Sequence, residues 1–517
     1  MINLPGIDFR KNKLITLQIG LLLGVSLLLR IVDLGYSNFL GDEISTLCRF
    51  SNFKTPLQFL AYLLGQRKGP VQYLVTCAFS IFDPTFSSEL ALRLPFAVAN
   101  LIALVCFFFL VYRLFTLQVA IYSSFLFATN GIFIAFARIV QYQSFVILGV
   151  VAGVLGLTLA LQHEKWKVYG LYLGFLSAAM ALLAHFDAAF IMMPMAVLVL
   201  HWWRKFYNQP DFVRLRKHLI AATMLFAVLV LAFYIEYAIR LGSYQTNYWG
   251  ERLTGESTNI LRLFQFYNPG PVLWISLGSV VIGLTRIRKS ISWQVTLAWF
   301  LPPLIFMTMV VQDSRTHAYT YLLPLLIVAG IGIDTFISWL HLLLRGKSTQ
   351  IAHAIVLTIF LVFSYLSYMI FIDHDPAYPW YPKSILGMKL GGGYLAGTFG
   401  FPYSREWRDI ARWFDKLPDK YVFLVTNEDL EVPAFYLPSK VRYEYISSEF
   451  PGQIQTAHGL YFLVIQRPEN WMNRLWGWPL DKWHEKFAPL HDFVNGDGKI
   501  VASVYFLTQE QIDAEFH

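Results

Sequence analysis

Two adjacent carboxylates, Asp42 and Glu43, stand in the segment 40–44, shortly after the first apolar stretch of the chain. A carboxylate can take a proton from an incoming hydroxyl or amine, and a low-dielectric boundary can tune its affinity for that proton. Carboxylate oxygens can also hold a divalent cation. The pair is therefore a candidate general base or metal ligand set, and a solvated acidic turn is the plainer alternative.

The apolar stretch before this pair, residues 14–34, has the length of a membrane-spanning helix. Three cations precede or open it: Arg10, Lys11 and Lys13. Such cations favour the cytoplasmic side of a membrane, so the carboxylates should emerge at the opposite surface. An enzyme acting on a lipid-linked substrate would need its acid or base there.

The composition is that of a membrane protein. Hydrophobic residues make up 56% of the 517 residues and charged residues 14%, whereas a soluble domain carries roughly 25% charge. The net charge is +8, but the basic residues fall mostly between apolar segments. The positive net charge is therefore explained by membrane topology, and we expect membrane lipids rather than nucleic acid as partners.

The three cysteines, Cys48, Cys77 and Cys106, are scattered along the chain. They show no spacing typical of a metal site. On spacing alone they predict no disulfide framework.

Eleven segments have the apolar character of membrane spans: 14–34, 93–113, 118–137, 144–162, 167–184, 188–203, 218–239, 270–285, 292–311, 318–340 and 351–372. Basic residues flank the connections 114–117, 163–166, 204–217, 286–291 and 341–350, as the positive-inside rule requires of cytoplasmic loops. An odd number of spans places the C-terminal part outside. Segment 70–83 is apolar but only about fourteen residues long, which favours a juxtamembrane helix.

With this topology, polar residues collect at the ends of apolar segments on the outer side: Lys68, Arg93, Arg138, Gln141, Gln143, His185, Asp187, Asp313, Arg315 and His317. Loops are polar in any case, which explains part of the pattern. Arg93 and Arg138, however, stand at the edges of apolar runs, where an ionisable side chain is a functional candidate. The sequence thus predicts a shared cavity at the outer leaflet.

The chain divides into a transmembrane part (1–372, with a first outer loop at 35–92 that carries juxtamembrane helices), a linker (373–403) and a soluble α/β domain (404–517). Pro, Gly and aromatic residues in the linker predict a segment that follows the interface with Tyr378, Trp380 and Tyr381. Ser404 predicts a cap for a helix over 405–416. Strand character marks 422–425, 441–446, 460–465 and 500–506.

Several short motifs follow the carboxylate pair in a fixed order: Lys68-Gly69-Pro70, Leu92-Arg93-Leu94-Pro95, Ala137-Arg138-Ile139-Val140-Gln141, His185-Phe186 and Tyr321-Leu322-Leu323-Pro324. Their order and their common side resemble the C-type (GT-C) glycosyltransferases. The branch with the protein O-mannosyltransferases and the lipid A aminoarabinose transferases is the most similar. The resemblance covers about residues 14–340.

This resemblance implies an integral-membrane transferase that moves a sugar from a polyprenyl phosphate to an acceptor at the outer leaflet, with inversion. Asp42 is then the general base, and Glu43 supports it by position, hydrogen bond or a shared divalent metal. Lys68 contacts the donor phosphate, because cations stabilise the charge of a leaving phosphate. Arg93, Arg138 and Arg315 are further phosphate ligands, and the sugar or donor tunnel involves Gln141, Gln143, His185, His317 and Tyr321.

The chain departs from this family in one place. Many relatives carry a second acidic residue just after the arginine at 138, where this chain has the neutral Gln141 and Gln143. These amides can hydrogen-bond a sugar but cannot act as a base. Asp187 or Asp313 could compensate.

Two other classes remain open at this stage. A transporter or lipid flippase would show charged groups at mid-membrane and matching halves. A membrane scaffold would leave the outer polar cluster unexplained. For the transferase, the sequence selects neither the sugar nor the acceptor, which could be a protein, a lipid or a glycan. We expect an inner (cell) membrane of bacterial type, with the active site and the C-terminal domain extracytoplasmic.

Overall fold

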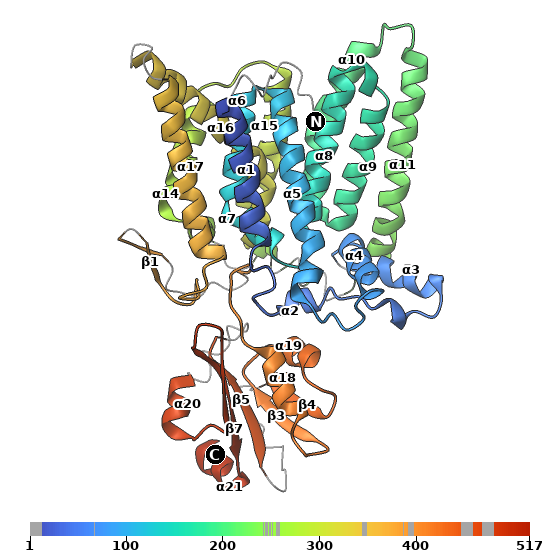
Figure 1. Ribbon diagram of the computed structural model, residues 1–517. Coiled ribbons are helices and arrows are strands. Elements are labelled where there is room, and N and C mark those ends of the chain that lie inside the picture. The colour runs from blue at the N-terminus through green and yellow to red at the C-terminus, as the bar shows by residue number, and fades with distance from the viewer. Residues whose placement is uncertain are drawn as a thin grey trace.

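The computed structural model describes residues 13–66, 68–240, 242, 247, 250, 252–254, 259–343, 349–385, 387–390, 398–445, 459–467 and 480–516. Parts of several predicted features lie outside these residues: Arg10 and Lys11 before the first span, 344–348 of the last cytoplasmic loop, 386 and 391–397 of the linker, and 446–458, 468–479 and 517 of the soluble domain, including the last residue of the predicted strand 441–446. A helical bundle forms the larger unit, and a smaller unit built on a β-sheet lies beyond one end of it (Figure 1).

Every segment predicted as a span is helical. The bundle contains α1 (Lys13–Ile31), α5 (Glu89–Leu114), α6 (Leu117–Thr129), α7 (Gly131–Ala137), α8 (Gln143–Gln162), α9 (Tyr169–Ala184), α10 (Met192–Phe206), α11 (Phe212–Ile239), α13 (Ile260–Tyr267), α14 (Gly270–Leu284), α15 (Ile291–Ile305), α16 (Tyr319–Leu343) and α17 (Thr349–Phe371).

Fewer of these helices are long enough to cross a membrane than the sequence predicted. Among the described residues, eight helices meet the length and composition of a span, or nine if the bent pair α6 and α7 is one span. This pair bends by 63° at Asn130, whose side chain accepts a hydrogen bond from the Ile132 amide and caps α7. Helices α9 and α14 are shorter apolar helices. The apolar run 70–83 forms only the ten-residue helix α4 (Val71–Ser80).

Small residues allow close packing inside the bundle. Helices α8 and α9 pack against each other through glycines, and a Cβ atom on Gly156 would lie 2.6 Å from the backbone nitrogen of Gly174. Apolar side chains gain little from leaving lipid for a protein interior, so such backbone approach is what holds membrane helices together. The packing places the start of α8 and the end of α9 side by side.

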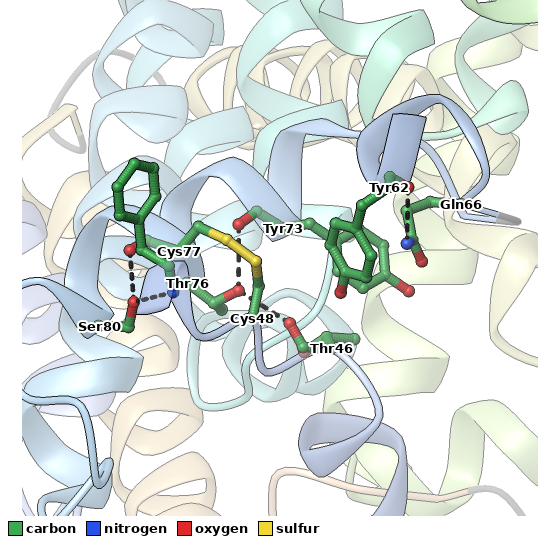
Figure 2. Close-up of a disulfide and its surroundings, with 9 residues drawn as sticks. Thr46, Cys48, Tyr62, Gln66, Tyr73, Thr76, Cys77 and Ser80 are labelled. Atoms are coloured by element: carbon green, nitrogen blue, oxygen red, sulfur yellow. Dashed lines mark hydrogen bonds between the residues drawn. A yellow bond between two sulfur atoms is a disulfide. The ribbon is translucent and has the colours of Figure 1, made fainter. Parts of the chain in front are cut away.

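The loop between α1 and α5, which the sequence predicted as the first outer loop, carries α2 (Gly41–Ile44), a 3-10 turn (Phe50–Asn52), α3 (Pro56–Leu64) and α4, at the end of the bundle that faces the sheet unit (Figure 1). A disulfide joins Cys48, just after α2, to Cys77 in α4 (Figure 2). Thr76 reinforces it, because its hydroxyl donates to the Thr46 carbonyl at 2.8 Å. The prediction of no disulfide was wrong, since cysteines 29 residues apart in sequence meet only after the loop folds back.

Five described strands form the sheet of the smaller unit, in the order β4-β3-β5-β7-β6. Strand β3 (Val422–Thr426) pairs in parallel with β4 (Val441–Tyr445) and β5 (Leu460–Ile465), and β7 (Ile500–Leu507) pairs antiparallel with β5 and β6 (His491–Val494). The four predicted strands are confirmed to within a residue, and β6 is an addition. Helices α18 (Trp407–Asp415), α19 (Glu431–Tyr436), α20 (Leu480–Lys486) and α21 (Gln509–Phe516) complete the unit.

Two local predictions were wrong in this part of the chain. Glu406, at φ 56°, precedes α18 in the cap position, while the Ser404 hydroxyl donates to the Glu406 carboxylate at 2.8 Å. In the linker, which includes the hairpin β1 (Lys383–Ile385) and β2 (Met388–Leu390), Tyr378 is only 2% exposed. Its hydroxyl donates to the Phe266 carbonyl at 2.6 Å, so this ring packs into the bundle instead of following the interface.

The sheet unit contacts the first outer loop through polar groups and through the packing of α19 against α2 (Figure 1). The Tyr436 hydroxyl accepts a hydrogen bond from the Phe39 amide and donates one to Glu89, both at 2.8 Å. Arg408 forms an ion pair with the same glutamate at 2.9 Å. The Arg405 amide donates to the Asn38 side chain at 2.8 Å. The unit thus lies against the segment that carries Asp42.

Candidate functional site

Asp42 is the exposed carboxylate of the pair. Its side chain is 64% exposed on the short helix α2. The Lys68 ammonium lies 3.1 Å from one carboxylate oxygen, and the Gln141 amide donates to the other at 3.0 Å. Two donors therefore fix the carboxylate while solvent reaches it, an arrangement that suits a group that must meet an incoming substrate.

Glu43 is fully buried and fixes the position of the helix. Its two oxygens accept hydrogen bonds from the Arg93 guanidinium at 2.8 and 2.7 Å, in a bidentate pair. They also accept from the backbone amides of Val140, at 2.9 Å, and Leu40, at 3.0 Å. The last bond caps α2 at its first turn. A buried bidentate pair with further amide donors is rigid, so Glu43 holds α2 against α5 and the start of α8.

Arg93 and Arg138 bind the backbone between α1 and α2. Beyond Glu43, Arg93 donates to the carbonyls of three residues in this connection: Leu34, Ser37 and Asn38. Arg138 donates to three carbonyls at the end of α1: Leu29, Val32 and Asp33, at 3.2, 2.8 and 3.0 Å. The last carbonyls of a helix lack intrahelical partners, so a buried arginine there satisfies them. The structure places both arginines as supports of the chain that leads to Asp42.

Two glutamines extend the Asp42 site toward α8. The Gln143 amide donates to the Gln141 side-chain oxygen at 3.0 Å, and Gln141 in turn donates to Asp42. The side-chain oxygen of Gln143 is buried and has no hydrogen-bond partner among the described residues. The two amides form a relay that orients Asp42.

A second cluster lies at the end of α9 and the start of α16. The Nδ1 atom of His317 is 2.6 Å from one oxygen of Asp187, and the Tyr319 hydroxyl donates to the same oxygen at 3.1 Å. The Nδ1 atom of His185 is 3.2 Å from the other oxygen. The His185 ring stacks on Tyr142 with ring centres 3.9 Å apart. The buried Asp187 carboxylate thus joins the end of α9 to His317, which lies 130 positions further along the sequence.

Gly69 brings Lys68 next to this cluster. It adopts φ +98°, and a Cβ atom there would lie 2.4 Å from the Leu183 carbonyl, so only glycine fits. The backbone next to Lys68 therefore lies directly against the C-terminal end of α9, where His185 begins the second cluster. The Asp42–Lys68 pair and the histidine cluster are adjacent parts of one site.

A cavity of about 440 Å³ opens beside the second cluster. Its wall combines Asp187 and His317 with a polar rim of Arg252, Asp313 and Ser314, and an aromatic and apolar part formed by Phe186, Phe190, Tyr234, Tyr237, Phe306, Met307 and Val311. The Ser314 hydroxyl is buried, in a residue that is 1% exposed, and has no partner among the described residues. A cavity with a charged end and an aromatic wall suits an amphiphilic ligand.

The remaining predicted residues lie around this cavity. Arg315 is half exposed and forms an ion pair with Asp313 at 2.9 Å, and Arg252 donates to the Asp313 carbonyl at 2.6 Å. Tyr321 does not line the cavity. It packs behind the wall with Met307 and Val311.

The structure joins Asp42, Lys68, Gln141 and Gln143 in one group and His185 and His317, through Asp187, in an adjacent one. Tyr142, Tyr319 and Arg252 were not among the site residues predicted from the sequence. A tyrosine next to an apolar run is common in membrane proteins, so the sequence offered no signal that would single out the two tyrosines.

The sheet unit adds one carboxylate to the surroundings of Asp42. Burial raises the pKa of the Glu431 carboxyl, at the start of α19, and the nearby charges of Asp429 and Asp42 raise it further, against the opposing effect of Lys68. Glu431 was not among the residues expected at the site.

Comparisons with known proteins bear on the fold. Residues 67–235 match the family model described as dolichyl-phosphate-mannose-protein mannosyltransferase. No curated protein sequence matches the chain significantly.

Three solved structures share the fold. ArnT from Cupriavidus metallidurans, bound to undecaprenyl phosphate, has a TM-score of 0.53 at 12% identity, over 95% of this chain and 98% of that chain. The Archaeoglobus fulgidus oligosaccharyltransferase, tethered with an acceptor peptide, gives 0.52 at 14%, over 97% and 74%. The arabinofuranosyltransferase AftD from Mycobacteria gives 0.51 at 12%, over 97% of this chain but only 40% of its own length. The resemblance to the GT-C glycosyltransferases is thereby confirmed, at these identities as a likeness of fold.

Proposed function

We propose that this chain is a membrane glycosyltransferase that moves a sugar from a polyprenyl-phosphate donor to a hydroxyl or amine acceptor. The observation that carries the proposal is the exposed Asp42 carboxylate, held by Lys68 at 3.1 Å beside a cavity with a charged end and an aromatic wall. The fold of ArnT, whose structure holds undecaprenyl phosphate, supports a donor of this class.

In the proposed reaction, Asp42 takes the proton of the acceptor as its oxygen or nitrogen attacks the anomeric carbon. The bond from that carbon to the phosphate oxygen breaks, and the polyprenyl phosphate leaves with the electron pair. Attack opposite the leaving phosphate inverts the anomeric centre. Lys68, now paired with Asp42, is close enough to exchange partners and neutralise the leaving phosphate, the step at which charge develops.

The contacts of Glu43, Arg93 and Arg138 support a different role from the one the sequence suggested. The two guanidinium groups together donate to six backbone carbonyls. Glu43 accepts from two backbone amides and forms an ion pair with Arg93. Turning either arginine toward a phosphate would leave buried carbonyls unsatisfied, which costs about 1–3 kcal/mol for each group. We therefore assign all three as positioning residues for Asp42, and we do not retain Glu43 as a metal ligand.

The donor is proposed to occupy the cavity between α11, the helical turn 186–191 before α10, the turn 306–310 after α15 and the segment 313–317 before α16. Arg252 and Arg315 would neutralise the phosphate, and the aromatic wall would hold the first isoprene units. Gln141, Gln143 and His185 lie nearer to Asp42 and would hydrogen-bond the sugar. Tyr321 would shape the cavity from behind its wall, through Met307 and Val311.

The disulfide supports an extracytoplasmic site. Disulfides persist in oxidising compartments and are rare in the cytosol. Cys48 and Cys77 lie in the loop that carries Asp42, whereas Arg204 and Lys205 lie in the last turn of α10, the end of that helix opposite the cavity. Basic residues favour the cytoplasmic side. Both observations support our proposal that Asp42 and the sheet unit lie outside the cytoplasm.

The experiment is a turnover assay on the purified full chain in lipid nanodiscs, with a panel of polyprenyl-phosphate sugars. Free polyprenyl phosphate and the glycosylated acceptor are measured by mass spectrometry. We expect at least one donor to be consumed with stoichiometric transfer or slow hydrolysis. Movement of intact donors across vesicle membranes without loss of sugar would contradict the proposal and favour a flippase.

A further inference from the structure

We propose that His185, Asp187 and His317 form a binding site for one divalent transition-metal ion, with Zn²⁺ as the best-suited cation. Each side chain offers one ligand atom, and the three atoms all lie within 4.8 Å of one another. Two imidazoles and one carboxylate are a ligand set that binds Zn²⁺ and similar ions. The site is separate from the Asp42–Glu43 pair.

The distances are close to those of a coordinated ion. With ligand bonds of about 2.0–2.2 Å, neighbouring donor atoms around a tetrahedral zinc ion lie roughly 3.3–3.5 Å apart. The His185 nitrogen and one Asp187 oxygen are 3.2 Å apart, and the His317 nitrogen and the other oxygen are 2.6 Å apart. A shift of less than about 1 Å at His317 would open the site to the ion.

The surroundings of His185 bring its ring next to Asp187. The Nδ1 atom lies 3.2 Å from one carboxylate oxygen of Asp187 and 3.2 Å from the Asp187 backbone nitrogen. An ion bound here would take the nitrogen lone pair in place of the backbone amide, and its charge would offset the cost of burying the carboxylate.

Neighbouring groups already orient the ligands. The Tyr319 hydroxyl donates to Asp187, and the Tyr142 ring stacks on His185. Partners of this kind fix ligand orientation in metal sites and raise affinity. His185 and Asp187 are buried and His317 is partly buried, so the site is shielded from bulk water.

A bound ion would be reachable from the cavity, because Asp187 and His317 both line it. The Ser314 hydroxyl in the same wall has no partner within the described part of the chain, which is a further sign that the cavity receives a polar ligand. If the proposed transferase function holds, the donor phosphate is the group that would complete the coordination, and the ion would add positive charge to that of Lys68. This role rests on the proposed function, whereas metal binding does not.

Calorimetry and elemental analysis on the chelator-stripped full chain in nanodiscs test the site, with Zn²⁺ and Co²⁺ as probes. We expect one equivalent of Zn²⁺, proton release on binding, and a visible Co²⁺ absorption typical of a low-coordinate site. Asp187→Asn and His317→Ala should each weaken binding by at least 100-fold. The control is His201→Ala on α10, where the ring bonds Gln294 outside the cluster, and it should bind as the wild type does.

The variants are first compared with the stripped wild type by melting temperature, so that a folding defect is separated from lost ligation. The absence of a bound equivalent in the wild type would overturn the site. Wild-type Zn²⁺ affinity in both Asp187→Asn and His317→Ala would also overturn the site. Zn²⁺ binding that is lost in Asp42→Asn and kept in these two variants would overturn it too. Wild-type stoichiometry that depends on Asp187 and His317 supports the site even if no sugar transfer is found, and that result would count against the proposed function alone.

Discussion

The two faces of helix α2 carry the same kind of side chain in opposite environments. On one face, Glu43 is buried and accepts four hydrogen bonds from Arg93 and the backbone. On the other, Asp42 is exposed and held by one lysine and one glutamine from outside the helix. The first carboxylate is committed to the structure and the second remains accessible. Adjacency in sequence therefore does not imply a shared role.

The same contrast divides the cations. Arg93 and Arg138 are buried and saturated by backbone carbonyls, whereas Lys68 and Arg315 pair with acidic side chains at the edge of the site. A cation that faces a carboxylate near a cavity can exchange partners with a substrate phosphate. A cation that satisfies buried carbonyls cannot do so without exposing them.

Removing the buried Arg93–Glu43 pair should have the largest effect on stability. Arg93→Ala leaves Glu43 buried without its partner, and we expect a loss of about 3–5 kcal/mol, seen as a lower melting temperature of the purified chain. The control is Arg49→Ala in the same loop, where an exposed guanidinium donates to the Pro84 carbonyl. Equal melting temperatures for both variants would show that the Arg93–Glu43 pair does not fix α2.

Removing the disulfide tests how firmly the first outer loop is held. Cys48→Ser should destabilise this loop by about 2–4 kcal/mol, because the bond closes a loop with a sequence separation of 29. Faster proteolysis between residues 45 and 80 is the expected sign, and Cys106→Ser, at the free cysteine, is the control. A proteolysis rate unaffected by Cys48→Ser would contradict the disulfide as a tether of the Asp42 segment.

Removing the charge of the accessible Lys68 should produce a smaller change, in the affinity for the donor. Lys68→Met should weaken the affinity for a polyprenyl-phosphate lipid by about 1.5–3 kcal/mol, the worth of one charge-assisted contact. Lys54→Met, at an exposed position of the same loop, should bind as the wild type does. Native mass spectrometry of lipid binding measures both. Unchanged affinity in Lys68→Met would return the lysine to a purely structural role beside Asp42.

The smallest effect is expected at Glu431. Its folded-state pKa is raised by burial and by the charges of Asp429 and Asp42, so the folded chain resists its ionisation more than the unfolded chain does. Stability is therefore lost as pH rises from the ordinary range of a glutamate through the raised value. Glu431→Gln should remove this loss and gain at most a few tenths of a kcal/mol above that window, because Glu431 is exposed and solvent screens the charges around it, with no difference below the window. Melting curves across pH would show a gain at low pH instead if the assignment is wrong.

The sequence predicted the elements well because apolar length and strand composition are local properties. All predicted spans are helices and all four predicted strands are present. Asp42, Lys68, Gln141, Gln143, His185 and His317 were also proposed together, since span ends on one side of a membrane must meet. Roles that depend on partners in space are beyond such local patterns. An arginine at the edge of an apolar run fits phosphate binding and helix capping equally well, and the contacts of Arg93 and Arg138 are the basis on which we propose the second role.

Pairings between distant residues were beyond the reach of the pattern. The spacing of Cys48 and Cys77 does not predict their disulfide. Ser404 has the residue type of a helix cap, but in the structure its hydroxyl donates to the Glu406 carboxylate. The central place of Asp187 follows from two histidines 132 positions apart in sequence, His185 and His317, that meet only in the folded bundle.

The turnover of Asp42→Asn tests the central claim most directly, with Asp415→Asn, an exposed carboxylate on α18, as its matched control. The substitution keeps the shape of the side chain and removes its basicity. We expect turnover to fall by about 10²–10⁴ while the donor still binds and the chain melts at the wild-type temperature. The product of the residual reaction should be inverted at the anomeric carbon. Near-normal turnover in Asp42→Asn, with a stable fold, would contradict Asp42 as the base.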